Sequence, residues 1–143
     1  MKSLYILSWL VIISAIALML LFGFWMLYPY KPIVYNDPVY PILNENKTAT
    51  VGGILSYEVD YCKYTDIYPT VFKRYVDGII YQTPPGRGIV YQGCRVQQVD
   101  NLVPTTLMPG KYKMEVIIDY QMNPIRHIVY TNYTEEFTII AKE

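Results

Sequence analysis

The sequence predicts an all-β domain, a sandwich of about seven antiparallel strands, carried on one N-terminal transmembrane helix. Three observations lead to this prediction. Residues 4–28 contain no charged side chain. From Thr48 onward, apolar and polar residues alternate with a period of two, as in half-buried strands. Turn-forming residues separate these runs at regular spacing, and no later stretch has the apolar period of a helix.

The uncharged run, Leu4 to Tyr28, is long enough as a helix to cross a hydrocarbon core about 30 Å thick. Trp9 and Trp25 lie near its two ends, where aromatic side chains favour the membrane interfaces. The alternative is a cleaved signal peptide, with an apolar region of about 7–15 residues before a small-residue cleavage site. This run is longer, and its Ala15-Ile16-Ala17 lies in the middle. We therefore expect residues 1–28 to be an uncleaved signal-anchor helix in the lipid bilayer.

The orientation of the helix in the membrane is indicated less strongly than its presence. Lys2 precedes the helix and Lys31 follows it, so the positive-inside rule gives only a small bias. The tail before the helix is short, and all the folding material follows it. We expect a cytoplasmic N-terminus and a C-terminal domain that is periplasmic in a bacterium or lumenal or extracellular in a eukaryote.

Residues 29–43 are predicted to be a proline-rich extended linker. Prolines at 29, 32, 38 and 41 disfavour helix, so the membrane helix should stop at Tyr28. Such a spacer could hold the domain up to about 40 Å from the bilayer. Alternatively, Val39 to Leu43 form an edge strand, where proline is tolerated. The β domain is then residues 44–143.

Two runs in that domain alternate most clearly, Leu55 to Tyr61 and Tyr112 to Tyr120. Asp77-Gly78 is a two-residue hairpin signal. Further strands are expected at 71–76, 79–82 and 89–96, and residues 125–131 and 136–141 are expected to form the last strand, broken or bulged near Asn132. The chain also contains 16 tyrosines, which either pack in the core and on strand surfaces or form a specialised binding surface.

The segment Leu107 to Tyr112 resembles a motif of immunoglobulin-like and fibronectin-like modules. In these sandwiches a Tyr follows a Gly turn at the start of the penultimate strand, and its hydroxyl ties the corner to the backbone. Pro109, Gly110 and Tyr112 match this tyrosine corner, and Asn123-Pro124 looks like the next turn. The resemblance implies an Ig-like sandwich. The hallmark Trp and the disulfide spacing of antibody domains are absent.

Cys62 and Cys94 are the two cysteines, and an even count in a non-cytoplasmic domain suggests a disulfide. Their phases disagree. Cys62 alternates with Asp60 and therefore points to the polar face, whereas Cys94 shares its phase with Val96 and should point inward. The alternative is two free thiols in a cytoplasmic domain.

The sequence shows no constellation of catalytic residues, so we expect no enzyme activity, no cofactor, no metal and no small-molecule substrate. His127 is the only histidine, and the motifs of serine hydrolases, zinc proteases and phosphate-binding loops do not occur. Glu135 and Glu136 beside Asn132 are a weak cation-site alternative. Lysines and arginines do not cluster, so nucleic-acid binding is not expected. Sequons at Asn46 and Asn132 matter only in a eukaryotic secretory pathway.

Two functions fit these features. The first is a non-enzymatic structural or interaction module that docks onto a larger envelope, phage or virion assembly, with other membrane or envelope proteins as partners. The second is an accessory subunit of a membrane enzyme or transporter complex. In that case the helix itself would pack against a partner helix through small residues such as Ser14, Ala17 and Gly23.

Overall fold

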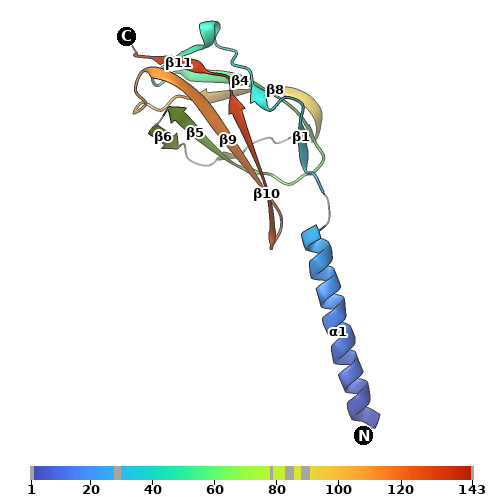
Figure 1. Cartoon of the computed structure of the whole chain (residues 1–143). Helices are drawn as coiled ribbons and strands as arrows, with labels where there is room; N and C mark the ends of the chain where they lie inside the picture. The colour runs from blue at the N-terminus through green and yellow to red at the C-terminus, as the bar shows by residue number, and fades with distance from the viewer. Residues whose placement is uncertain (1, 28–29, 78, 83–85, 88–90, 143) are drawn as a thin grey trace.

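The computed structural model describes residues 2–27, 30–77, 79–82, 86–87 and 91–142. The chain is mostly β, with one N-terminal apolar helix, α1 (Lys2–Leu27), as expected (Figure 1). The span Tyr5–Leu27 is long and apolar enough to cross a membrane, and none of it is buried inside the protein. Apolar side chains cover every face of α1, so it has no stripe that would suit a soluble core.

The first sheet has three antiparallel strands in the order β1-β4-β8. Their bounds are β1 (Ile33–Tyr35), β4 (Ile54–Lys63) and β8 (Gly93–Leu102). The sequence missed β1, and it placed β8 too early, at 89–96. Residues 88–90 lie outside the described residues.

The second sheet is built around the long strand β9, which pairs with β5, β10 and β11. Its strands are β2 (Val39–Tyr40), β3 (Thr48–Thr50), β5 (Thr70–Asp77), β6 (Ile79–Gln82), β7 (Gly86–Arg87), β9 (Gly110–Asn123), β10 (Arg126–Thr134) and β11 (Phe137–Ile140); a 3-10 turn, η1 (Glu45–Lys47), precedes β3. This sheet curls, and it is mixed, because β2 pairs with β10 and β3 with β11 in parallel. The prediction of purely antiparallel sheets was therefore wrong at these two pairs.

The alternating pattern places one face of each sheet in a shared interior. In β4, Leu55, Tyr57, Val59 and Tyr61 are buried, and the residues between them face outward. In β9, the run from Tyr112 to Tyr120 does the same. These were the two clearest alternating runs in the sequence, and both point inward as expected.

Tyrosine side chains fill much of this interior. Those almost completely buried are Tyr40, Tyr57, Tyr61, Tyr75, Tyr112 and Tyr120. The rings of Tyr40 and Tyr57 stack at 5.7 Å between centroids and thereby join the two sheets. Tyr75 packs edge-on against Phe137 at 6.1 Å. These six tyrosines therefore pack in the core, which was one of the two roles expected from the sequence.

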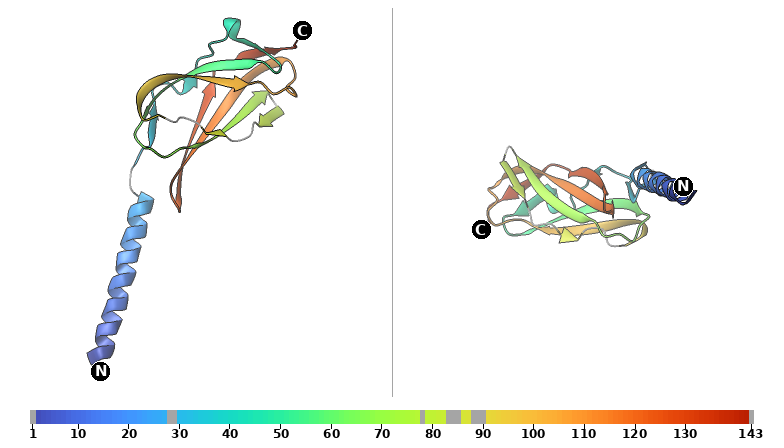
Figure 2. Two further views of the ribbon diagram at one scale, coloured as in Figure 1. Left: turned by 180° about the vertical axis from the view of Figure 1, so that it is seen from behind. Right: turned by 90° about the horizontal axis from the view of Figure 1, so that it is seen from below.

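The proline-rich segment lies within the β domain. Ile33 and Tyr40, which begin β1 and end β2, are both almost fully buried. Between the two strands the chain crosses from the first sheet to the second, and the Asp37 carboxylate accepts a hydrogen bond from the Val39 N–H (2.8 Å) at the crossing. Because α1 ends at Leu27 and β1 begins at Ile33, the helix leads almost directly into the domain (Figure 2).

The buried tyrosines make stability depend on alkaline pH. Burial raises the pKa of Tyr75 to about 12, and burial also raises the pKa values of Tyr35, Tyr40, Tyr57 and Tyr120. Stability from a raised pKa is complete below the unfolded value, near pH 10 for tyrosine, and is lost as the pH rises through the folded value. Burial lowers the pKa of Lys63 and Lys73, which titrate in the opposite sense, but they are two groups against five.

We therefore expect the free energy of unfolding to fall steeply above pH 10. The slope is about 1.4 kcal/mol per pH unit for each tyrosine that ionises only when unfolded. Urea unfolding of the detergent-solubilised chain at several pH values measures it, with tyrosinate absorbance as the readout. A flat profile above pH 10 would show that these hydroxyls reach solvent in the folded protein.

Candidate functional site

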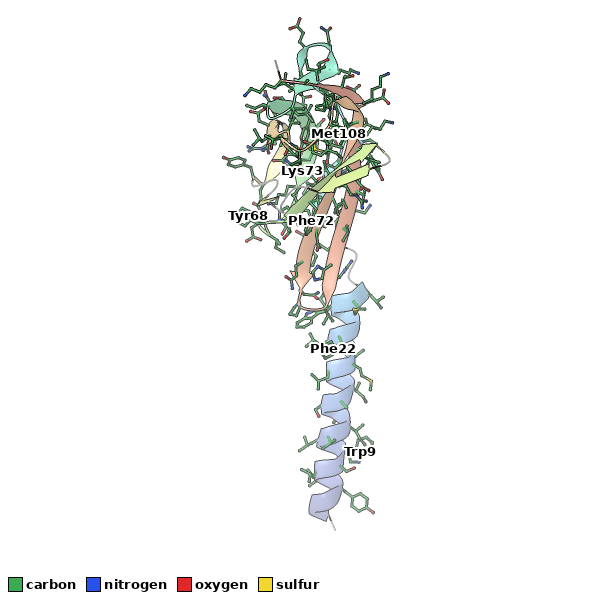
Figure 3. The ribbon with its side chains drawn as sticks, turned by 90° about the vertical axis from the view of Figure 1, so that its left-hand side faces the viewer. Trp9, Phe22, Tyr68, Phe72, Lys73 and Met108 are labelled. Atoms are coloured by element: carbon green, nitrogen blue, oxygen red, sulfur yellow. A yellow bond between two sulfur atoms is a disulfide. The ribbon has the colours of Figure 1, made fainter. Side chains whose placement is uncertain are left out.

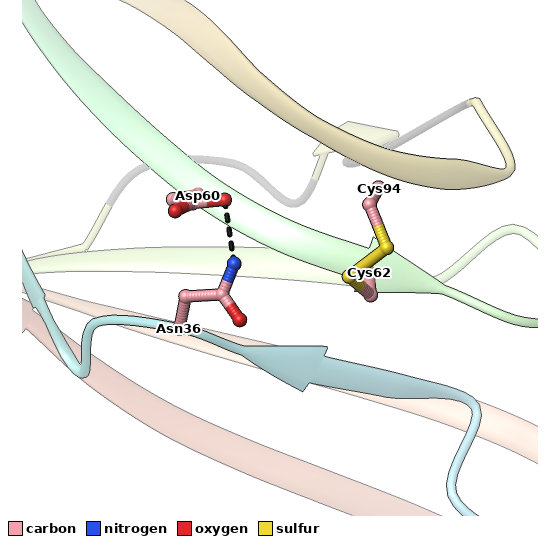
Figure 4. The surroundings of a disulfide bond; sticks show 4 residues. All are labelled: Asn36, Asp60, Cys62 and Cys94. Atoms are coloured by element: carbon pink, nitrogen blue, oxygen red, sulfur yellow. Dashed lines mark hydrogen bonds between the residues drawn. A yellow bond between two sulfur atoms is a disulfide. The ribbon is translucent and has the colours of Figure 1, made fainter.

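The outer face of the first sheet carries the disulfide. Cys62 and Cys94 are directly opposite each other on β4 and β8 and are bonded, with Cα atoms 3.9 Å apart (Figure 4). Cys94 is exposed and Cys62 is half-buried. The outward phase predicted for Cys62 was correct. The inward phase predicted for Cys94 was wrong, because it was inferred from Val96, an apolar residue that itself faces outward with 57% of its surface exposed.

The polar residues of that face are paired with one another. Asn36 donates to the Asp60 carboxylate at 2.8 Å, next to the disulfide in Figure 4. Farther along, the Ser56 hydroxyl and the Gln98 amide both donate to Asp100, at 2.7 and 3.0 Å. These hydrogen bonds, that from Ser56 first, lower the pKa of Asp100 and keep it ionised.

Strand β8 forms the edge of this sheet. Among the described strands it pairs with β4 alone, and nearly all its side chains are exposed or half-buried. Two of the exposed ones are apolar, Val96 and Leu102, and Ile54 of β4 lies opposite Leu102 on the same face. An edge strand offers unpaired N–H and C=O groups to a partner strand. We refer to the exposed residues of β8, which include Val96 and Leu102, together with Ile54 as the β8 edge.

Directly behind the β8 edge runs a chain of polar contacts inside the core. The Lys73 ammonium donates to the Asn101 side-chain oxygen at 2.9 Å, and the Asn101 amide donates to the Tyr75 hydroxyl at 2.7 Å. Lys73 Nζ also lies 5.6 Å from the centre of the Tyr57 ring. These polar contacts were not predicted from the sequence, although the inward phase that Lys73 shares with Val71 and Tyr75 was a usable signal.

The predicted corner has a defined geometry. The Tyr112 hydroxyl donates to the backbone carbonyl of Met108 at 2.7 Å, four residues upstream. Pro109 lies between them, and Gly110 begins β9. Leu107 is buried while Met108 is exposed, so the turn is held from inside by one apolar side chain and one hydroxyl.

The other candidates lie apart from one another. His127 pairs with Asp119 at 3.0 Å on the outer face of the second sheet. Glu135 pairs with Lys47 at 3.0 Å and accepts a hydrogen bond from the Ile42 N–H. Asn132 is buried and donates to the Tyr40 hydroxyl at 2.8 Å, so its sequon is inaccessible in the folded domain. The described residues contain no group of three metal-ligating side chains.

Comparisons with known proteins leave the family open. No protein-family description matches the sequence, and neither does any curated protein. Among solved structures, 24 chains match. A protein of unknown function from Porphyromonas gingivalis W83 has a TM-score of 0.44 and 8% identity, over 78% of this chain and 49% of that one.

A second similar structure is a beta-glucosidase from Listeria innocua in complex with glucose. It has a TM-score of 0.34 and 12% identity, over 71% of this chain and 15% of that one. The chain thus spans about half the length of the first structure and a small part of the second. Likeness at this level carries no argument about function.

The disulfide generates the first prediction from this site. Non-reducing mass spectrometry of the folded protein should find one peptide pair joining Cys62 and Cys94 and no free thiol. Because Cys94 is exposed, a mild reductant should open the bond and lower stability by about 2–5 kcal/mol. Free labelling of both thiols before reduction would place the domain in a reducing compartment.

The hydrogen bond of the tyrosine corner leads to the second prediction. Tyr112→Phe removes the hydrogen bond to Met108 and leaves a carbonyl without its partner, so we expect a loss of roughly 1–3 kcal/mol in urea unfolding. The matched control is Tyr120→Phe, because the buried Tyr120 hydroxyl has no hydrogen-bond partner among the described residues. That change should be neutral or stabilising. Lys111→Ala should stay within about 0.5 kcal/mol of wild type. Equal effects of the two Phe substitutions would contradict a role for the Tyr112 hydroxyl.

Proposed function

We propose that the chain is a membrane-anchored, non-enzymatic interaction module that docks onto a larger envelope, phage or virion assembly. α1 spans the bilayer, and the β domain presents the β8 edge to a partner protein. Two pairs of ionisable side chains support this proposal, because Arg74–Glu115 and His127–Asp119 each join neighbouring strands and so have a structural role. Arg74 of β5, for example, pairs with the buried Glu115 of β9, which also accepts a hydrogen bond from Tyr133 (3.1 Å).

We further propose that the domain is Ig-like. Support comes from the strand order, β1-β4-β8 in one sheet and β2-β10-β9-β5 in the other, with a first strand that switches sheets. The tyrosine of the corner starts β9, the penultimate long strand. Ig-like sandwiches serve many functions, so this proposal concerns architecture and not activity.

The disulfide supports a non-cytoplasmic domain. Exposed disulfides persist in oxidising compartments and are reduced in most cytosols. With α1 as an uncleaved signal anchor, the N-terminus is cytoplasmic and the domain is periplasmic, lumenal or extracellular.

The observation that carries the docking proposal is the exposed apolar surface of the β8 edge. Soluble domains usually protect a long edge strand with charges, prolines or bulges. Here Val96 and Leu102 point to solvent from a ten-residue strand. Strand addition to such an edge uses main-chain hydrogen bonds for affinity and the alternate side chains for specificity.

The second candidate, an accessory subunit that binds through its helix, is favoured by Gly23. A Cβ built at Gly23 meets nothing within 4 Å, so the chain itself does not require glycine there. Small residues let membrane helices approach closely. A partner helix would account for glycine at this position.

Complex size in mild detergent tests both functions. Wild-type protein from its native membrane should run as a complex larger than one chain, and Val96→Lys should reduce it to the chain alone. Val129→Lys is the matched control. Val129 is 56% exposed against 57% for Val96, and each lies opposite an aspartate on the neighbouring strand. If Gly23→Leu disperses the complex and Val96→Lys does not, the helix-binding subunit is the function. A wild-type chain that runs alone would contradict both.

A further inference from the structure

We propose that the domain rests on the bilayer surface and that the turn of the β9–β10 hairpin inserts into the interfacial layer of the membrane. The partner surface is therefore lipid, contacted beside the end of α1. This inference rests on the proposed membrane anchoring and goes beyond it, because an anchor alone leaves the domain free to stand away from the membrane.

The hairpin turn lies next to the end of the helix. Figures 1 and 2 show the hairpin reaching below the rest of the domain, to the level of the last turns of α1. Asn123 makes the connection. Its side-chain nitrogen donates to the Trp25 carbonyl at 3.4 Å, and its side-chain oxygen accepts the Ile125 N–H at 3.0 Å. One side chain thus shapes the turn and positions it against the helix.

The turn has the composition of a membrane contact. Pro124 and Ile125 form it, both are exposed, and Ile125 leaves 44% of its surface uncovered. Two-residue hairpin turns normally carry Gly, Asn or Asp. A large aliphatic side chain at the tip of a hairpin is unfavourable in water and favourable in the interfacial layer.

A second group of contacts brings an aromatic residue to the same end. The Tyr64 N–H donates to the Pro32 carbonyl at 2.9 Å, and the Tyr30 hydroxyl donates to the Tyr64 carbonyl at 2.8 Å. Tyr64 is held against the chain leaving the helix, with 58% of its surface exposed. Tyr and Trp favour the membrane interface because a ring and a polar group meet there.

The lysine and the aromatic residues near the end of the helix also suit a membrane surface. Lys31 is exposed immediately beyond the helix end, and Trp25 lies on the last turns of α1, edge-on to Phe22 at 6.1 Å. A lysine at this level can reach the phosphate groups of the lipids while aromatic rings occupy the boundary below. Trp25, Lys31, Tyr64 and Ile125 therefore define a membrane-facing end.

Site-specific fluorescence of the full chain in phosphatidylcholine nanodiscs tests the contact. A polarity-sensitive probe is attached to a cysteine introduced at Pro124, which leaves Ile125 in place, and the bonded native cysteines do not react. Met108→Cys is the control for exposure alone, since Met108 is 64% exposed and lies far from the helix (Figure 3). Ser14→Cys, in the middle of α1, reports whether the helix is in the bilayer.

We expect lipids with a quencher near the headgroup to reduce the fluorescence at position 124 and leave that at 108 unchanged. Adding Ile125→Ser should weaken the quenching at 124. If the Ser14 probe is shielded from water but the probe at 124 behaves like that at 108, the anchoring stands and the surface contact is wrong. If the Ser14 probe is open to aqueous quencher, the membrane anchoring itself fails and the contact with it.

Discussion

The core of this domain depends on the hydrogen-bond requirements of its buried tyrosines. A buried hydroxyl without a hydrogen-bond partner lowers stability, so each buried tyrosine needs a polar atom near its hydroxyl in the interior. Three such demands are met by amide side chains: Asn132 for Tyr40, Asn101 for Tyr75 and Gln97 for Tyr61. The hydrogen bond between Asn101 of β8 and Tyr75 of β5 connects the two sheets, whereas those of Asn132 and Gln97 join neighbouring strands within one sheet.

This requirement explains features that would look misplaced in an aliphatic core. Asn101 and Asn132 are buried polar residues in a core that otherwise consists mainly of apolar and aromatic side chains. Lys73 reaches into the interior because Asn101 offers it an oxygen and Tyr57 offers a ring face. A core of leucine and valine would need none of these side chains. The aromatic core therefore sets the register of the strands through polar pairs as well as through shape.

Much of this could be read from the sequence, and the failures have physical causes. Long alternating strands such as β4 and β9 were recognised because their period is set by burial on one face. β1 was missed because it is three residues long and follows a proline, whereas β2 begins at Val39, as the edge-strand alternative expected, but is shorter than predicted. The side-chain direction of Cys94 was predicted wrongly because Val96, an apolar residue that faces outward at the β8 edge, was assumed to belong to the core. The hydrogen bonds that link Lys73, Asn101 and Tyr75 join residues from different sheets, and no local sequence pattern predicts such contacts.

The parallel pairing of β2 with β10 has a mechanical consequence. The helix joins the domain at one end, and the C-terminus lies at the other (Figure 1). β2 is tied to β10 by the Tyr133 N–H to the Pro38 carbonyl and the Glu135 N–H to the Tyr40 carbonyl, at 3.4 and 2.9 Å. Tension between the two termini would pull these strands past each other lengthwise. Their hydrogen bonds would have to break together, in shear, rather than open one after another from an end.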